Sequence, residues 1–189
     1  MNKVYNTVWN ESTGMWVVTS ELTRKGGQRP RQIKRTVLAG LVAGLLLPSQ
    51  PVLAAAYDNQ TIGSGGTSSS MSLGTGDTAT NTTINDGGFQ NVNSGGSATS
   101  TVINSGGGQL VSSGGSATST VINSGGGQLV SSGGSATDTS INKDGLQIVS
   151  SGASATNTTI VDFGKQHVSG GSATNTTINR NGRQYISSG

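Results

Sequence analysis

A few side chains in the second part of the chain are of types that could do acid–base chemistry. They are the carboxylates Asp86, Asp138, Asp144 and Asp162 and the imidazole of His167. Hydrolysis needs such groups to converge on one reacting bond. The four carboxylates do not share one position of the repeat described below, and His167 is alone on the variable face of its segment. No cysteine is present to form a Cys–His pair. The sequence therefore predicts no enzyme and no catalytic residue.

The glycine-rich segments do not fit a metal site either. Calcium-binding β-rolls repeat a Gly-Gly-x-Gly-x-Asp motif, whereas residues 106–109 read Gly-Gly-Gly-Gln, with no Asp in place. We therefore expect no metal and no cofactor. The Thr80-x-Thr82 pairs are similar to the threonine ladders of ice-binding β-helices, which is a further alternative. That function needs both threonines to face water, whereas Thr82 has the same parity as Ile84.

These residues all lie in a short internal repeat. Ser94–Ser112 and Ser113–Ser131 are identical, and isoleucines at 84, 103, 122, 141, 160 and 178 step by 19 four times and then by 18. Such periodicity predicts a solenoid, in which each unit buries its apolar face against its neighbours. We assign residues 77–189 to six tandem repeats, the last one shortened, and 57–76 to a degenerate capping rung.

Alternation within each repeat indicates short strands. Residues 80–85 read Thr-x-Thr-x-Ile-Asn, with constant and variable positions alternating, which predicts one six-residue strand with Thr82 and Ile84 inward. A second strand contains Gln90-x-Val92, and glycine corners separate the strands. The expected fold class is all-β, a right-handed parallel β-helix. Ladders of Asn85, Asn104, Asn123 and Asn142 should add hydrogen bonds between rungs.

Charge and hydropathy set residues 1–54 apart from the rest of the chain. Seven Lys and Arg against two Glu give this prefix a charge of +5, and the remainder carries −2. Because the basic residues belong to the prefix, nucleic-acid binding is not predicted. A basic stretch, an apolar run at 37–47 and small residues before Tyr57 are typical of a secretory signal. Residues 1–54 are thus an extended signal peptide, with cleavage after Ala54 or Ala56.

The opening of the chain, MNKVYNTVWNESTGMWVVTSELTRKGG, and the 19-residue repeats resemble the AIDA-type self-associating autotransporter adhesins. The resemblance implies a virulence-associated, secreted passenger that mediates host-cell adhesion, bacterial autoaggregation and biofilm formation. Its implied partners are an unknown host-cell surface receptor, like molecules on neighbouring cells and a cytoplasmic glycosyltransferase, a heptosyltransferase. Outward hydroxyls would carry the sugar, and the candidate O-glycosylation sites are Thr83, Ser100, Ser112, Ser113, Ser119, Ser131, Ser132, Ser140, Thr159 and Thr177.

The sequence ends at Gly189, before any strands that would form the translocator barrel of this family. We expect the N-terminal passenger part of an adhesin, exported through the inner membrane. The full-length family resides at the cell surface in the outer membrane. The alternative is a truncated periplasmic fragment that is not surface-exposed and has no function.

Overall fold

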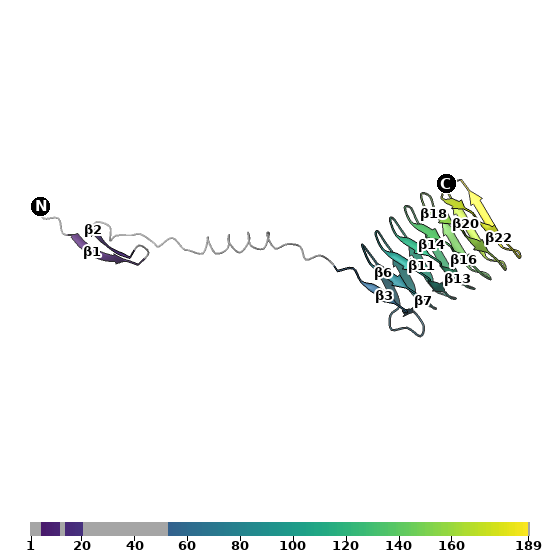
Figure 1. Cartoon of the computed structure of the whole chain (residues 1–189), viewed down its shortest axis with the longest axis horizontal. Coiled ribbons are helices and arrows are strands. Elements are labelled where there is room, and N and C mark those ends of the chain that lie inside the picture. The colour runs from purple at the N-terminus through teal and green to yellow at the C-terminus, as the bar shows by residue number, and fades with distance from the viewer. Residues whose placement is uncertain (1–4, 12–13, 21–52, 189) are drawn as a thin grey trace. The chain divides into compact units, whose positions relative to one another are not determined.

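A computed structural model describes residues 5–11, 14–20 and 53–188, which fall into two compact units, 1–51 and 52–189 (Figure 1). We describe each unit by itself. The apolar run 37–47 and the basic stretch that precedes it, assigned above to the signal peptide, lie outside the described residues.

The first unit contains an antiparallel β-hairpin of β1 (Tyr5–Asn10) and β2 (Met15–Ser20). Trp9 pairs with Trp16 across the strands, and their ring centroids lie 5.4 Å apart at an interplanar angle of 65°. Edge-to-face aromatic pairs of this kind stabilise a cross-strand contact. This region was predicted only as part of the signal peptide, and no hairpin was expected in it.

The second unit consists of three parallel sheets of seven strands each. Sheet I is made of β3 (Ala56–Asp58), β6 (Thr78–Thr80), β9 (Ser97–Thr99), β12 (Ser116–Thr118), β15 (Ser135–Thr137), β18 (Ser154–Thr156) and β21 (Ser172–Thr174). Sheet II is made of β4 (Thr61–Ile62), β7 (Thr83–Ile84), β10 (Val102–Ile103), β13 (Val121–Ile122), β16 (Ser140–Ile141), β19 (Thr159–Ile160) and β22 (Thr177–Ile178). Sheet III is made of β5 (Ser70–Leu73), β8 (Phe89–Val92), β11 (Gly108–Val111), β14 (Gly127–Val130), β17 (Leu146–Val149), β20 (Lys165–Ser169) and β23 (Arg183–Ser187).

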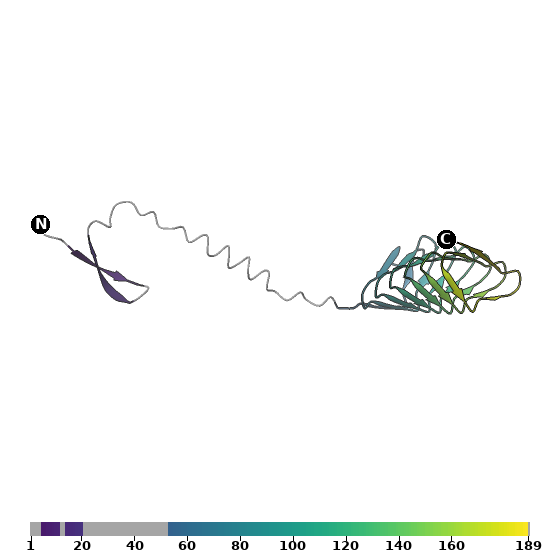
Figure 2. The same cartoon turned by 90° about the horizontal axis from the view of Figure 1, so that it is seen from above.

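Each turn of the chain contributes one strand to every sheet, and successive turns stack in sequence order (Figures 1 and 2). Equivalent repeat positions pair directly, so that Gln109 lies beside Gln128 and Ile103 beside Ile122. Residues 56–73 supply the first strand of all three sheets. The prediction of a parallel β-solenoid with one sequence repeat per turn is confirmed.

The predicted six-residue strand at 80–85 is wrong in one respect, because the chain bends in the middle of it. Asn81 has a φ of 55°, and its equivalents in every later rung, which include Ser100 and Ser119, also have positive φ. A left-handed residue redirects the chain and ends a strand. Thr78–Thr80 therefore belongs to sheet I, and Thr83–Ile84 belongs to sheet II.

Two apolar columns fill the interior of the solenoid. One contains the alanines of sheet I together with Leu73 and the valines of sheet III, and the other contains the isoleucines of sheet II from Ile62 to Ile160. The predicted inward positions Thr82 and Ile84 are both fully buried. The interior is therefore built from the same few residue types in every rung.

A column of buried glutamines, whose burial was not predicted from the sequence, lies in the same interior. Gln90, Gln109, Gln128, Gln147 and Gln166 are at most 2% exposed. Nε2 of Gln128 donates to Oε1 of Gln109 at 2.7 Å and to Oγ1 of Thr120 at 3.3 Å, and the pattern recurs along the stack. Among the described residues, no buried side-chain nitrogen or oxygen lacks a hydrogen-bond partner.

The predicted asparagine ladder is confirmed. Nδ2 of Asn104 donates to Oδ1 of Asn85 at 2.9 Å, and Asn123 and Asn142 continue the series. These amides are partly buried at the corner between sheets II and III. From Asn85 to Asn142 the rungs are therefore joined by two side-chain amide ladders in addition to the backbone bonds of the sheets, and the asparagine ladder ends where Val161 takes the next position.

Candidate functional site

The interior of the solenoid is closed and uniform, so any recognition must use its outer surface. Within residues 5–11, 14–20 and 53–188, no three His, Cys, Asp or Glu side chains gather as a metal site would require. The described residues also contain no helix long and apolar enough to cross a membrane. The outer side chains of the rungs are therefore the candidates that remain.

None of the candidate hydroxyls for glycosylation is buried. Ser113, Ser119, Ser132 and Thr177 are exposed, and the other six are half-buried. Ser100 and Ser119 lie at the left-handed bend between sheets I and II, each with a φ of 57°, rather than on the face of a strand.

Two of the half-buried hydroxyls already make side-chain hydrogen bonds. Oγ of Ser112 donates to Oδ1 of Asn93 at 3.2 Å, and Oγ of Ser140 donates to Oδ1 of Asn142 at 3.3 Å. Modification of either serine would break its bond. The exposed corner serines Ser113 and Ser132 are easier for an enzyme to reach.

Further exposed corner serines were not among the predicted sites. The Ser-Gly pattern that singled out Ser113 also marks them, so the sequence contained the signal, and they include Ser64, Ser94, Ser105, Ser124 and Ser151. Corner hydroxyls thus repeat along the stack on two edges, one between sheets II and III and one between sheets III and I.

Sheet III presents two outer columns, because its strands alternate inward and outward side chains. The first outer column precedes the buried glutamine in each strand and contains Phe89, Gly108, Gly127, Leu146, Lys165 and Arg183. The second outer column follows that glutamine and contains Asn91, Leu110, Leu129, Ile148, His167 and Tyr185.

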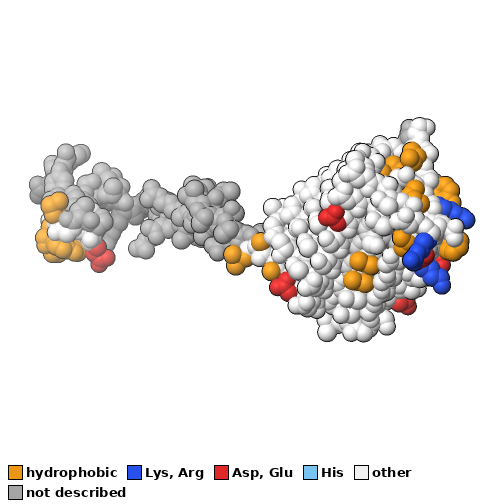
Figure 3. Space-filling view, turned by 45° about the vertical axis from the view of Figure 1, so that its right-hand side comes forward, with side chains coloured by type: hydrophobic (Ala, Val, Ile, Leu, Met, Phe, Trp, Pro, Cys, Tyr) orange, Lys and Arg blue, Asp and Glu red, His pale blue; other side chains and the backbone are white. Residues whose placement is uncertain are grey.

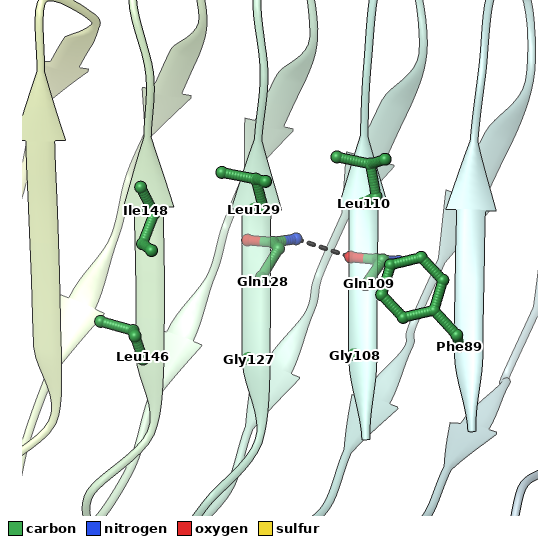
Figure 4. Close-up of a pocket in the computed structure, with 9 residues that line it drawn as sticks. All are labelled: Phe89, Gly108, Gln109, Leu110, Gly127, Gln128, Leu129, Leu146 and Ile148. Carbon is green, nitrogen blue, oxygen red and sulfur yellow. Dashed lines mark hydrogen bonds between the residues drawn. The ribbon is translucent and has the colours of Figure 1, made fainter. Parts of the chain in front are cut away.

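The first outer column is hollow over Gly127 and only partly so over Gly108, towards which the Phe89 ring leans (Figure 4). This hollow, which we name the trench, has a volume of about 270 Å³. Phe89 and Leu146 close its two ends, and the side chains of the second outer column form its wall. Phe89 is 42% exposed and Leu129 39% exposed, so the site is an apolar depression open to solvent.

The two trench glycines differ in their surroundings. A Cβ added at Gly108 would lie 2.8 Å from the Phe89 ring, whereas a Cβ at Gly127 would meet nothing within 4 Å. Neither glycine has a positive φ. The backbone conformation at position 127 therefore does not require glycine. The missing side chain there affects only the outer surface.

Beyond the trench the same two columns become basic and aromatic. Lys165 and Arg183 continue the first outer column, while His167 and Tyr185 stack in the second with ring centroids 4.7 Å apart. Lys and Arg side chains gather towards one end of the face shown in Figure 3, on a surface that is otherwise mostly neutral. His167 faces solvent, as expected from its position.

Comparison with protein families finds two matches. Residues 1–50 match the extended signal peptide of the type V secretion system. Residues 75–126 and 108–164 match the adhesin of the bacterial autotransporter system, described as a probable stalk. The first match lies within the basic prefix, and the second lies almost entirely within the 19-residue repeats.

Two curated relatives align with 92 residues, or 49%, of this chain. The autotransporter CRAC of Citrobacter rodentium is 80% identical, and the autotransporter adhesin/invasin TibA of enterotoxigenic Escherichia coli is 83% identical. The aligned region spans only 6% of CRAC and 9% of TibA.

A solved structure with the same fold is the crystal structure of a fragment of TibA, described as hyper-glycosylated by TibC. It is 55% identical, has a TM-score of 0.59, and the alignment covers 69% of this chain and 55% of that one. The stalk repeats, the type V signal peptide and the shared solenoid together show that this chain belongs to the AIDA-type autotransporter adhesins.

Proposed function

We propose that these rungs form part of an adhesive passenger that mediates host-cell adhesion, bacterial autoaggregation and biofilm formation. The observation that carries the proposal is the outer face of sheet III, which exposes an apolar stripe in a chain with only 10% charged residues. The adhesin family is non-enzymatic, and the proposal involves no reaction. The partners would be a host-cell surface receptor and like molecules on other cells.

The solenoid geometry supports this role because weak contacts add up along a stack of similar rungs. A single rung contributes little, whereas a surface covered with many copies binds through all of them at once. The proposal therefore concerns avidity and does not need a deep binding pocket.

We further propose that the outer hydroxyls are heptosylated by an enzyme similar to TibC. The related TibA fragment supports this through its glycosylation, and the exposed positions of Ser113 and Ser132 make them the favoured sites. Intact-mass spectrometry after co-expression with such an enzyme should show additions of one heptose each. Ser113→Ala together with Ser132→Ala should lower the number of additions, while a Thr120→Ser control, at a fully buried position, should not.

For export we propose signal cleavage after Ala54 rather than after Ala56. The backbone N–H of Ala55 donates to Oδ1 of Asp77 at 2.7 Å, and the Ala55 carbonyl accepts from the Thr78 N–H at 2.8 Å. Ala56 pairs with Thr78 in sheet I. Cleavage after Ala56 would remove these contacts from the first rung. N-terminal sequencing of the exported protein should therefore read Ala-Ala-Tyr, and a Tyr start would contradict this site.

The experiment that tests the function is surface accessibility combined with cell settling. The chain, tagged after Tyr57, is expressed from its native locus, and protease sensitivity is compared on intact and permeabilised cells. Cleavage on intact cells together with faster settling than the deletion strain supports the adhesin. Protection until permeabilisation, with unchanged settling, would instead favour the periplasmic fragment.

A further inference from the structure

The two outer columns of sheet III are complementary in shape to each other. Over two adjacent rungs the first outer column has glycines, Gly108 and Gly127, and the second has leucines, Leu110 and Leu129. From this we infer that sheet III docks face to face on sheet III of a second copy, with both stacks running in the same direction. This inference adds to the proposed contact between cells a second contact between two copies, and it specifies the surface, the register and the direction.

A two-fold axis parallel to the stack, midway between the two columns, generates the arrangement. It reverses the strand direction in the second copy but keeps the order of the rungs. Each first-column residue then faces the second-column residue of the same rung in the other copy. Leu129 of each copy enters the trench of the other above Gly127, and Leu110 packs against the Phe89 ring that leans over Gly108. A two-fold contact of this kind uses the same patch on both copies.

The opposite direction of stacking does not give this fit. A two-fold axis along the strands, centred on the trench, places Gly108 opposite Gly127 and Leu110 opposite Leu129 of the second copy. Hollows then meet hollows and side chains meet side chains, which leaves voids and forces the sheets apart. Close packing favours the arrangement that fills each hollow, because unfilled space forfeits contacts.

The charges on this face are confined to its last two rungs. From Phe89 to Ile148 neither outer column contains a charged side chain. In the next two rungs Lys165 would face His167, and Arg183 would face the Tyr185 ring of the second copy. A guanidinium over an aromatic ring is attractive. Neither outer column of these rungs contains a carboxylate, so the Lys and Arg side chains of the two copies repel one another at this end and the apolar rungs must carry the contact.

The contact is small for an isolated pair. Four rungs spaced by about 4.8 Å, each contributing about four residues of strand, cover roughly 250 Å² per copy. A stable interface needs about 800 Å² per partner. The purified chain should therefore be mostly monomeric at micromolar concentration, and pairing should depend on crowding of copies. Copies extending from one cell run in the same direction, so this face suits neighbours on the same cell.

Disulfide trapping tests the register, since the chain has no cysteine of its own. Mixtures of two purified single-cysteine variants are oxidised at high concentration, and heterodimers are measured by differential tags. The Gly127→Cys and Leu129→Cys pair should crosslink about tenfold faster than the control pair Gly127→Cys and Ser113→Cys, in which Ser113 is an exposed corner position away from the trench. Fastest crosslinking between Gly108→Cys and Gly127→Cys would indicate opposite stacking and overturn the inference, as would equal rates for all pairs.

A swap of hollow and side chain provides a second test. Gly127→Leu alone fills the trench and should abolish the preferential trapping, read with the Gly108→Cys and Leu110→Cys reporters. Gly127→Leu combined with Leu129→Gly exchanges the two columns and should restore it, because the swapped faces still fit. The space at Gly127 accepts a Cβ without contact, and unfolding free energies of the variants check that the fold is retained.

These tests separate the inference from the proposed function. Register-specific trapping of the purified variants, together with cells that neither adhere nor settle, would retain the pairing and reject the adhesive role. Normal settling by the Gly127→Leu variant, without register-specific trapping of the parent chain, would retain the adhesive role and overturn this pairing surface.

Discussion

The two sides of sheet III differ sharply although the same short strands form both. On the inner side, Gln recurs in every strand from β8 onward and Val in all of these except β23, which has Ile186, and every buried amide is bonded to the rung before it. On the outer side, the same strands carry Phe, Gly, Leu, Lys or Arg at one position. Stacking thus dictates the inner side and leaves the outer side free to vary, so recognition belongs to the outer side.

The largest expected effect comes from the apolar column inside the solenoid. Ile122→Ala should lower the free energy of unfolding by about 2–5 kcal/mol, because Ile122 is fully buried and its loss leaves a cavity. Val121→Ala, at the adjacent outward position of β13, should cost less than about 1 kcal/mol. Urea denaturation of the two variants measures the difference. Equal losses would mean that the inner and outer sides are not energetically distinct.

The buried amide ladder should come next. Gln128→Ala removes the side-chain hydrogen bonds to Gln109 and Gln147, and it leaves Oε1 of Gln109 without the donor that Gln128 supplies. An unsatisfied buried polar group costs about 1–3 kcal/mol. Leu129→Ala, one residue along on the outer side, is the control and should change stability by about 0.5 kcal/mol or less. The idea of a stabilising ladder fails when both variants unfold at the same urea concentration.

The adjacent glycines Gly126 and Gly127 test the same difference between the inner and outer sides of the stack. A Cβ at Gly126 would lie 2.6 Å from the Ile103 carbonyl oxygen of the preceding rung, so Gly126→Ala should cost about 1–3 kcal/mol through overpacking. Gly127→Ala meets nothing and should be neutral or slightly stabilising. Thermal unfolding distinguishes them, and a stability loss at Gly127 would contradict the open trench.

The smallest effect concerns the first rung and its response to acid. The Asp77 carboxylate accepts hydrogen bonds from the backbone N–H groups of Ala55 and Gly74, and these lower its pKa below the ordinary value of 3.8. Because the folded pKa is lowered, the stabilisation is present above 3.8 and is lost as the pH falls through the folded pKa.

Amide hydrogen exchange at Ala55 and Gly74 checks this prediction. Protection should decrease on acidification below about pH 4 in the parent chain. The Asp77→Asn variant should show less protection at neutral pH and little further change with acid. An unchanged pH profile in that variant would assign the acid response to another group.

Much of the fold was predictable because the sequence repeats the same residue types at a fixed period. The period, the seven turns, the inward Thr82 and Ile84 and the asparagine ladder all follow from constant positions that stack in register. The bend at Asn81 was missed because alternation continues through it, and only the backbone conformation reveals that one residue is left-handed. The outward hydroxyls were predictable as a class, but which of them are bonded was not.

By itself the sequence determined the solenoid, since identical units that each bury little can satisfy their apolar and polar groups only by stacking. The tertiary structure decided the place of the glutamines, because a long polar side chain is normally exposed and becomes buried only where the neighbouring rung supplies both donor and acceptor. It also decided the trench. Gly108 and Gly127 are one full repeat apart in the sequence, and the lateral register of the rungs makes them one hollow beside two leucines.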